Sequence, residues 1–180
     1  MGENETNWQI FKDFPSIVYM GIDCSSKAVH AVLIDSTETV IAQGKWSSKI
    51  KDFPVRILEI AQKFEKDLSK IKVETEAAVE AAIFIQNPKS TMEIAGVVQG
   101  VRILCNQRDI YCHPVDNRHW KKYVLGKGNA NKQAIKEFTV DKWGDVFSEQ
   151  DWCDAACVAL WIKRRNLDEL TESEPQKEQR

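Results

Sequence analysis

The chain has 180 residues, of which 43% are hydrophobic and 29% charged, and its formal net charge is −2. This length and composition are typical of one globular domain whose core is large enough to fold without disulfides. No apolar run approaches the roughly 18 residues that cross a bilayer, and the first residues are polar and acidic, so we expect neither a membrane span nor a secretory signal. Five cysteines without a CxxC pair indicate reduced thiols, and the three histidines do not supply a zinc site.

The first half of the chain predicts a sheet that begins with three antiparallel strands. β-branched runs joined by short polar turns place these strands at residues 17–23, 29–35 and 39–46. The preceding residues, 1–16, are interpreted as an N-terminal extension. A helix is expected to follow the strands, capped by Asp52 and running to about Leu68, because apolar residues recur there at helical spacing.

The second half predicts alternating strands and helices. The run "AAVEAAIFI" at residues 77–85 is expected to be a fourth strand, although its alanines leave a helix as an alternative. Ser90 or Thr91 should begin a helix that reaches about Gln107, and "DIYCHP" predicts a short fifth strand. Two final helices and a charged, disordered tail are expected over three ranges: 129–143, 149–165 and 166–180.

This order of elements predicts the α/β class. We expect a five-stranded mixed sheet, with its first three strands antiparallel, flanked by helices. Residues 17–165 are predicted to form the single folded domain, between the N-terminal extension and the charged tail.

Four acids stand at unusual places in this pattern. Asp23 ends the first predicted strand, where a buried carboxylate is costly without a partner. Glu80 interrupts an otherwise apolar run. Asp151 and Asp154 stand at i and i+3 at the start of the last helix, so both carboxylates lie on one helical face.

Each of these acids also has an ordinary structural interpretation. Asp23 can cap a turn, and Asp151 completes a capping box with Ser148. Glu80 can lie on a helix surface, with Glu76 as the competing important acid. Together, however, carboxylates at one sheet edge repel each other unless a cation neutralises them, and oxygen-only ligands suit Mg²⁺ or Mn²⁺. Two such ions roughly 3.5–4 Å apart catalyse phosphodiester hydrolysis.

A basic segment follows these strands. The stretch "RHWKKYVLGKGNANKQAIK", residues 118–136, contains six lysines and arginines and no acid. A solvated helix face is the usual explanation of such a charge run. Gly126 and Gly128 interrupt the run, however, and glycine lets backbone amides approach a phosphate. An acid cluster beside this segment indicates cleavage of a polyanion.

Four motifs resemble those of the RuvC Holliday junction resolvases, which have the RNase H-like nuclease fold. "GIDCSS" is similar to the first-strand motif with its aspartate, and "VEAAIFIQNPKSTMEIAGVVQG" to the segment with a catalytic glutamate, which favours Glu80 over Glu76. "HWKKYVLGKGNANK" resembles the family's lysine-bearing segment, and "DWCDAACVAL" its closing aspartate motif. The motifs occur in the family's order over residues 17–162.

The chain also departs from the family pattern. Cys24 stands where many members have proline, and Trp152 and Cys153 replace small residues between the last two aspartates. Such divergence resembles phage or mobile-element members of the family more than the standard bacterial form.

The resemblance implies a crossover junction endodeoxyribonuclease that resolves four-way (Holliday) junctions by paired symmetrical nicks. It implies a cytoplasmic homodimer, in a bacterium or a phage-infected host, with two Mg²⁺ ions per site and Mn²⁺ as a substitute. The helix after Glu80 would lie near the dimer contact, where Met92 and Val98 belong either to a dimer seam or to the helix's own core face.

The resemblance also assigns roles to residues of this sequence. The implied metal ligands, which are also catalytic, are Asp23, Glu80, Asp151 and Asp154, and Lys132 completes the catalytic set. The DNA contacts that it implies are Arg118, Lys121, Lys122, Lys127 and Phe84. Phe84 would wedge between bases, with a core phenylalanine as the alternative. Two other functions stay open: a branched-DNA or flap endonuclease of the same fold, and a non-catalytic DNA-binding module.

Overall fold

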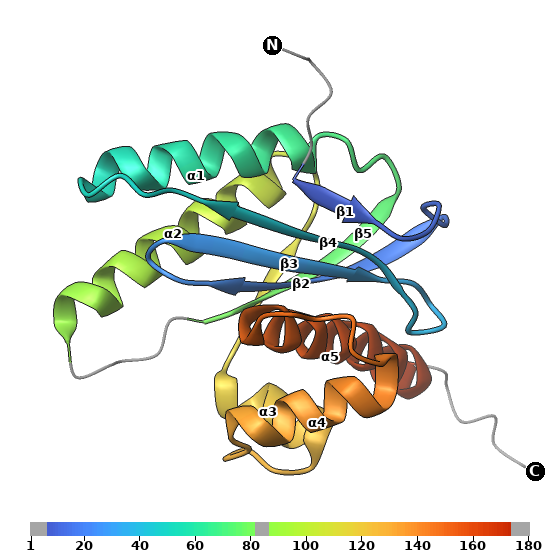
Figure 1. Cartoon of the computed structure of the whole chain (residues 1–180). Coiled ribbons are helices and arrows are strands. Elements are labelled where there is room, and N and C mark those ends of the chain that lie inside the picture. Colours follow the sequence, from blue (N-terminus) through green and yellow to red (C-terminus); the bar gives the residue numbers. More distant parts are fainter. Residues whose placement is uncertain (1–6, 82–86, 174–180) are drawn as a thin grey trace, which may run out of the picture.

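The computed structural model describes residues 7–81 and 87–173, with side chains described as far as residue 166. Six strands form one sheet in the order β1-β4-β3-β2-β5-β6. Helices α1 and α2 cover one face of this sheet, and α3, α4 and α5 lie on the other (Figure 1). The predicted α/β class is confirmed, but the sheet has one strand more than the five expected.

Three strands form the antiparallel meander that the sequence predicted: β2 (Ile17–Cys24), β3 (Ala28–Ile34) and β4 (Val40–Ser47). Two further strands extend the sheet in parallel: β5 (Glu74–Glu80) pairs with β2, and β6 (Cys112–Val115) pairs with β5. The segment predicted as a strand at residues 77–85 is therefore a strand up to Glu80, and residues 82–86 lie outside the described residues.

The additional strand, β1 (Trp8–Ile10), comes from the segment interpreted as an extension. It pairs antiparallel with β4 at the sheet edge. Trp8 is buried, and its indole N–H donates to the backbone oxygen of Asp67 at 3.1 Å. A strand of three residues has too short an alternation to be predicted from its pattern.

The helices mostly follow the prediction, with differences at their ends. Their bounds are α1 (Phe53–Leu68), α2 (Pro88–Asn106), α3 (Asn117–Leu125), α4 (Lys132–Trp143) and α5 (Gln150–Ser173). Asp52 caps α1 as expected. Helix α2 begins before Ser90, because Asn87 caps it by accepting from two backbone amides. Helix α5 continues past Arg165, so residues 166–173 are helical and not a disordered tail.

Helix α3 was not predicted. Asp116 caps its start, and Gly126 ends it with a φ of 77°, a conformation that glycine adopts without strain. Only Trp120 and Val124 are buried among its nine residues. The basic side chains between them hide the apolar periodicity on which a helix prediction depends.

The close packing of α5 on the sheet depends on Gly21 in β2. A Cβ atom at this position would lie 2.0 Å from the carbonyl oxygen of Ala155 and 2.1 Å from the backbone nitrogen of Ala159. The helix backbone therefore contacts the strand backbone directly. This contact brings the first turns of α5 to the sheet end at which β2 and β5 terminate. Cys153 and Cys157 are both buried on this helix.

The apolar stripe of α2 is mainly a core face. Val98 and Val101 are buried against the sheet, whereas Met92 is 74% exposed. No helix among the described residues is long and apolar enough to cross a membrane.

Candidate active site

Asp23 and Glu80 stand at the ends of two neighbouring parallel strands. The register pairs Ile22 of β2 with Val79 of β5, so the two acids occupy the next position on each strand. Ala78 packs in the core on the α5 side of the sheet. Because side chains alternate along a strand, Glu80 points to that same side.

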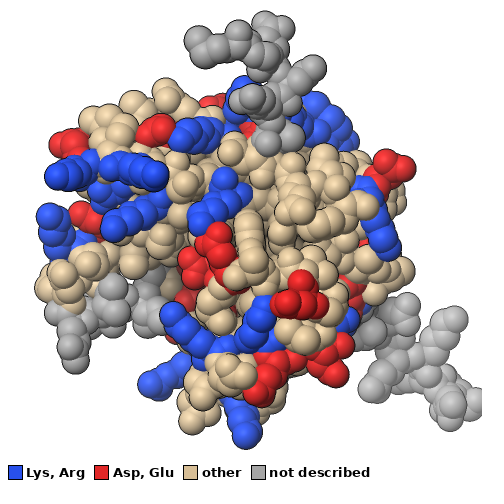
Figure 2. All heavy atoms as spheres, viewed as in Figure 1, with Lys and Arg blue, Asp and Glu red and all other residues tan. Residues whose placement is uncertain are grey.

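The first turns of α5 complete a group of four acids. Burial raises the pKa of Asp23 well above its usual value, and the negative charges of Glu80, Asp154 and Asp151 raise it further. Burial also raises the pKa of Asp154 to about 6, with contributions from Glu80 and Asp151. Figure 2 shows acidic side chains near the centre of one face, with basic side chains on both sides of them. The structure therefore brings together the four acids that the sequence singled out, and Glu76 lies further back, beside Tyr19.

Helix α3 fixes the Glu80 carboxylate. Asn117 donates its amide N–H to Glu80 Oε1 at 2.8 Å, and the Trp120 indole N–H donates to Oε2 at 2.7 Å. In α5, the Gln150 amide donates to Asp154 Oδ1 at 3.0 Å. Asn117 and Trp120 were not predicted as partners, because the helix that supplies them was not predicted.

A buried histidine stands beside the acids and was also not singled out from the sequence. His30 in β3 lies directly opposite Asp23 in the β2–β3 ladder and is 1% exposed. Burial lowers the pKa of His30, as does Lys45, while Asp151 and Glu149 oppose the shift. Lys45 binds both carboxylate oxygens of Glu149, at 2.8 and 2.6 Å. The only sequence signal for this histidine was a polar residue in the otherwise apolar run of β3.

Four of the five predicted DNA-binding residues lie on α3 and in the loop after it. Arg118, Lys121 and Lys122 belong to α3, and Lys127 to the loop that follows. The charge of Lys121 lowers the pKa of Asp154, which places this lysine near the acids. Gly128 holds the loop close to α3, because a Cβ atom there would lie 3.0 Å from the Arg118 carbonyl oxygen.

One further predicted site residue, Lys132, is not brought to the acids. Lys132 is the exposed first residue of α4, and no contact between it and the acids occurs among the described interactions. Phe84 lies outside the described residues. Of the residues that depart from the family pattern, Trp152 packs edge-on against the His30 ring, with ring centroids 5.8 Å apart. The substitution therefore forms part of the wall of the site.

The donor set suits a hard divalent cation. Its oxygens are all carboxylate oxygens, the ligands that Mg²⁺ and Mn²⁺ prefer. Burial is the main cause of the raised pKa values of Asp23 and Asp154, and the neighbouring acids raise both further; a cation relieves this crowding of negative charge. Among the described residues, no three His, Cys, Asp or Glu side chains are already arranged so that they could hold a metal ion. The acids are therefore gathered near one another but not fixed in a closed ligand shell.

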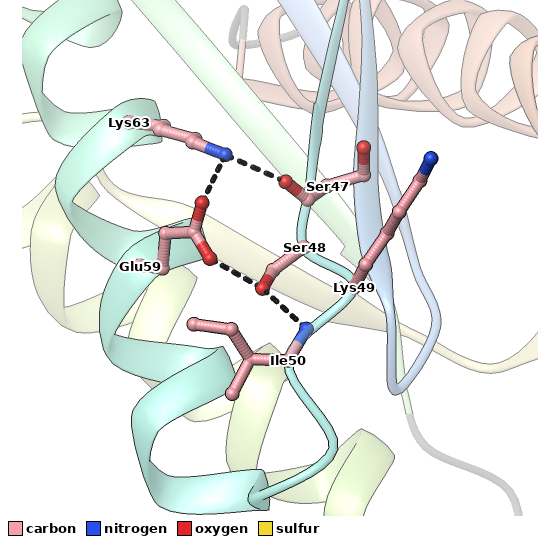
Figure 3. A pocket seen from close by; sticks show the side chains of 6 residues that line it. All are labelled: Ser47, Ser48, Lys49, Ile50, Glu59 and Lys63. Carbon is pink, nitrogen blue, oxygen red and sulfur yellow. Dashed lines mark hydrogen bonds and ion pairs between the residues drawn. The ribbon is translucent and has the colours of Figure 1, made fainter.

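The protein also has a pocket away from the acids. It has a volume of about 670 Å³ and lies where the end of β4 meets α1 (Figure 3). Lys63 binds Glu59 and the Ser47 carbonyl, and Glu59 accepts from Ser48. Lys63, Glu59 and Ser48 therefore already bind one another, and none of these three groups is free to bind a ligand.

Comparison with known proteins agrees with this geometry. The family model described as crossover junction endodeoxyribonuclease RuvC matches residues 19–161. The RuvC of Chloroherpeton thalassium is 30% identical over 112 residues, which cover 61% of this chain and 59% of that protein. The RuvC of Salinibacter ruber is 25% identical over 151 residues, 80% of this chain and 83% of that protein.

Two solved structures share the fold. Thermus thermophilus RuvC in complex with a Holliday junction substrate has a TM-score of 0.70 at 14% identity, and covers 83% of this chain and 94% of its own. Thermus thermophilus RuvC solved in a second structure has a TM-score of 0.68, also at 14% identity, over 84% and 96% of the two chains.

A mixed sheet whose parallel strands end in acids, covered by a helix that carries two more, defines an RNase H-like protein. The predicted fold is thereby confirmed. The family model covers more than half of the sequence, and the chain belongs to the RuvC family of crossover junction endodeoxyribonucleases.

Proposed function

We propose that this chain is a divalent-metal-dependent endonuclease that resolves four-way DNA junctions by paired, symmetrical nicks. The observation that carries this proposal is the group of four carboxylates at the ends of β2 and β5 and the start of α5. Members of the RuvC family are metal-dependent nucleases, and the Thermus relative was solved with a Holliday junction. Lys121 of α3 lies near Asp154, and the other basic residues of this helix would extend the surface that holds a polyanion.

The proposed metal ligands are Asp23, Glu80, Asp151 and Asp154, which would hold two Mg²⁺ ions. Divalent ions held there supply activation of the attacking water and stabilisation of the charge that develops on the phosphate. The chain's own groups orient this site: Asn117 and Trp120 hold Glu80, and Gln150 holds Asp154. Lys121 is assigned to the DNA backbone next to the acids, and Lys132 to the scissile phosphate once DNA is bound.

The test is cleavage of a mobile four-way junction with Mg²⁺, with the nicks mapped on both strands. We expect paired nicks at symmetrical positions, and no cleavage by Asp23→Asn, which should keep its affinity for the junction. Full cleavage by Asp23→Asn would remove this residue from the site. Cleavage of three-way and flap substrates is measured in the same experiment. Comparison of these rates with the rate on the four-way junction distinguishes a junction resolvase from a general branched-DNA nuclease. Junction binding without cleavage in any divalent metal would instead indicate a non-catalytic DNA-binding module.

A homodimer is the proposed assembly, because two opposed strands are cut. Exposed apolar side chains on the outer helices favour it: Val55 and Leu58 on α1, and Met92 and Ile103 on α2 are each at least half exposed. Light scattering after gel filtration should give twice the chain's mass of 20.6 kDa. The variant Met92→Glu should shift the protein toward the monomer and abolish paired, but not single, nicking. A monomeric wild-type protein would contradict the dimer.

A further inference from the structure

His30 is a buried polar residue at the acid site that the proposed function does not use. It lies opposite Asp23 in the β2–β3 ladder, so its ring is on the same face of the sheet as the acids. The ring is 1% exposed, and Trp152 of α5 packs edge-on against it. It is therefore held between the sheet and the first turn of α5.

Neither ring nitrogen of His30 has a hydrogen bond within the part of the chain that the structure describes. A buried polar atom without a partner costs about 1–3 kcal/mol, so such an atom requires an explanation. Two carboxylates stand at the ring: Nδ1 is 3.6 Å from Asp151 Oδ2, and Nε2 is 3.4 Å from Glu149 Oε2. Asp151 needs to approach Nδ1 by only a few tenths of an ångström to accept a hydrogen bond, whereas Nε2 already lies within bonding distance of Glu149 but not at a bonding angle.

Of these two carboxylates, Asp151 is the one with freedom to move toward the ring. Lys45 already binds Glu149 through both carboxylate oxygens. Asp151 has a side chain that is 42% exposed and lies in the first turn of α5, one turn before Asp154. The packed ring thus offers a fixed donor to a carboxylate that is otherwise half in solvent.

We propose that His30 is a positioning residue whose Nδ1–H orients the Asp151 carboxylate toward the other acids. This inference rests on the proposed function, because it assumes that Asp151 binds a divalent ion. Carboxylates that ligate metals are themselves held by hydrogen bonds, and the loss of such a partner typically costs 10–100-fold in metal affinity or activity. His30 supplies Asp151 with that partner, as Gln150 does for Asp154.

Three substitutions test which nitrogen matters. In His30→Asn the side-chain amide can take the place of Nδ1, and in His30→Gln the place of Nε2, whereas His30→Ala removes both. The readout is Mn²⁺ affinity of the DNA-free protein, followed by electron paramagnetic resonance of the free ion. We expect His30→Ala and His30→Gln to weaken Mn²⁺ binding by about 10–100-fold and His30→Asn to stay within about threefold of the wild type.

A matched control separates positioning from stability. Val32→Ala shortens another buried side chain of β3, on the same side of the sheet, and should lower the unfolding midpoint without weakening Mn²⁺ binding. Two outcomes would overturn the role of His30 but not the metal site. One is unchanged Mn²⁺ affinity in His30→Ala, and the other is an equal loss of affinity in all three variants that follows their loss of stability. Absence of Mn²⁺ binding by the wild-type protein would overturn the metal site itself, and the role of His30 with it.

Discussion

At the scale of single residues, the site consists of carboxylates and of the groups that hold them. Glu80 accepts hydrogen bonds on both oxygens, from Asn117 and Trp120 of α3. A carboxylate with two fixed donors keeps one orientation, which shapes the ligand set before any cation arrives. Asn117 and Trp120 come 37 and 40 positions after Glu80 in the sequence, and only the fold brings them to it.

The indole of Trp120 gives a first prediction. Trp120→Phe keeps an aromatic ring in the core but removes the N–H that binds Glu80, so junction cleavage at limiting Mg²⁺ should fall by about 10–100-fold. The control is Trp143→Phe, which removes an indole N–H that donates to the Glu38 backbone at 2.6 Å, away from the acids. Cleavage rates measured over a range of Mg²⁺ concentrations decide: equal rates for the two variants would exclude a role for the Trp120 N–H.

Residue patterns predicted the acids better than their partners. Asp23 and Glu80 were recognisable because a carboxylate at the end of an apolar strand conflicts with its surroundings, and that conflict is visible locally. His30 has the same kind of signal, since it interrupts an apolar strand, but its meaning depends on Asp151, which is far away in the sequence. Trp120 gave no signal, because a tryptophan in a basic segment is equally consistent with stacking on a base or packing in a core.

At the scale of elements, the placement of α5 on β2 decides where the second pair of acids lies. The small residues of both elements let their backbones touch, and Gly21 is the position where this approach is closest. Any side chain at that point pushes the helix from the sheet and moves Asp151 and Asp154 with it.

Gly21→Ala should therefore destabilise the protein and impair the site together. The added Cβ would meet backbone atoms at 2.0 and 2.1 Å, which cannot rotate away, so we expect a loss of about 3 kcal/mol or more in the free energy of unfolding. Gly100→Ala in α2 is the matched control: its nearest neighbour would be 4.0 Å away, and alanine in a helix should add about 0.5–1 kcal/mol. Urea unfolding measures both, and equal stability of the two variants would contradict the close contact.

Asp67 links three elements and gives a pH prediction. Its buried carboxylate accepts from the Trp46 indole at 2.9 Å, from Asn7 and from Lys70, and these bonds outweigh burial and lower its pKa to about 2. A lowered pKa stabilises the fold at pH values above the unfolded pKa, near 4, and this stability is lost as the pH falls toward 2.

The variant Asp67→Asn isolates this contribution, because asparagine does not titrate. At pH 7 its free energy of unfolding should be about 2 kcal/mol lower than that of the wild type, and this difference should shrink between pH 4 and pH 2. Chemical unfolding at a series of pH values measures it. A difference that does not change with pH would mean that hydrogen bonding, and not the charge, accounts for the effect.

The elements were predictable where their periodicity was long. The meander, α1 and the last two helices each repeat their apolar pattern over several turns or alternations, and each was located to within a few residues except at the end of α5, which continues from the predicted Arg165 to Ser173. The elements that were missed, β1 and α3, are short, and both are stabilised by long-range contacts: Trp8 with Asp67, and Trp120 with Glu80. In such segments tertiary packing, and not local pattern, determines the structure.

At the scale of the whole molecule, acidic and basic side chains are unevenly distributed over the surface, although the formal net charge is only −2. Acidic side chains gather near the centre of the face seen in Figure 2, and basic ones lie on both sides of them. A molecule of this net charge is not drawn to DNA as a whole, so binding depends on the local basic surface beside the acids. The salt dependence of binding should therefore be traceable to particular lysines.

The double variant Lys122→Gln/Lys127→Gln tests whether DNA binding depends on this local basic surface. Both lysines are exposed, one on α3, the helix that binds Glu80, and one in the loop after it. Each phosphate contact contributes about 0.9 to the slope of log K against log salt, so the slope for a four-way junction, measured without divalent metal, should become shallower by about 2. The control, Lys66→Gln/Lys72→Gln, removes the same charge from exposed positions near the end of α1 and before β5, at the far end of that strand from Glu80. It should leave the slope unchanged; an equal change in both variants would mean that DNA responds to total charge and not to the surface beside the acids.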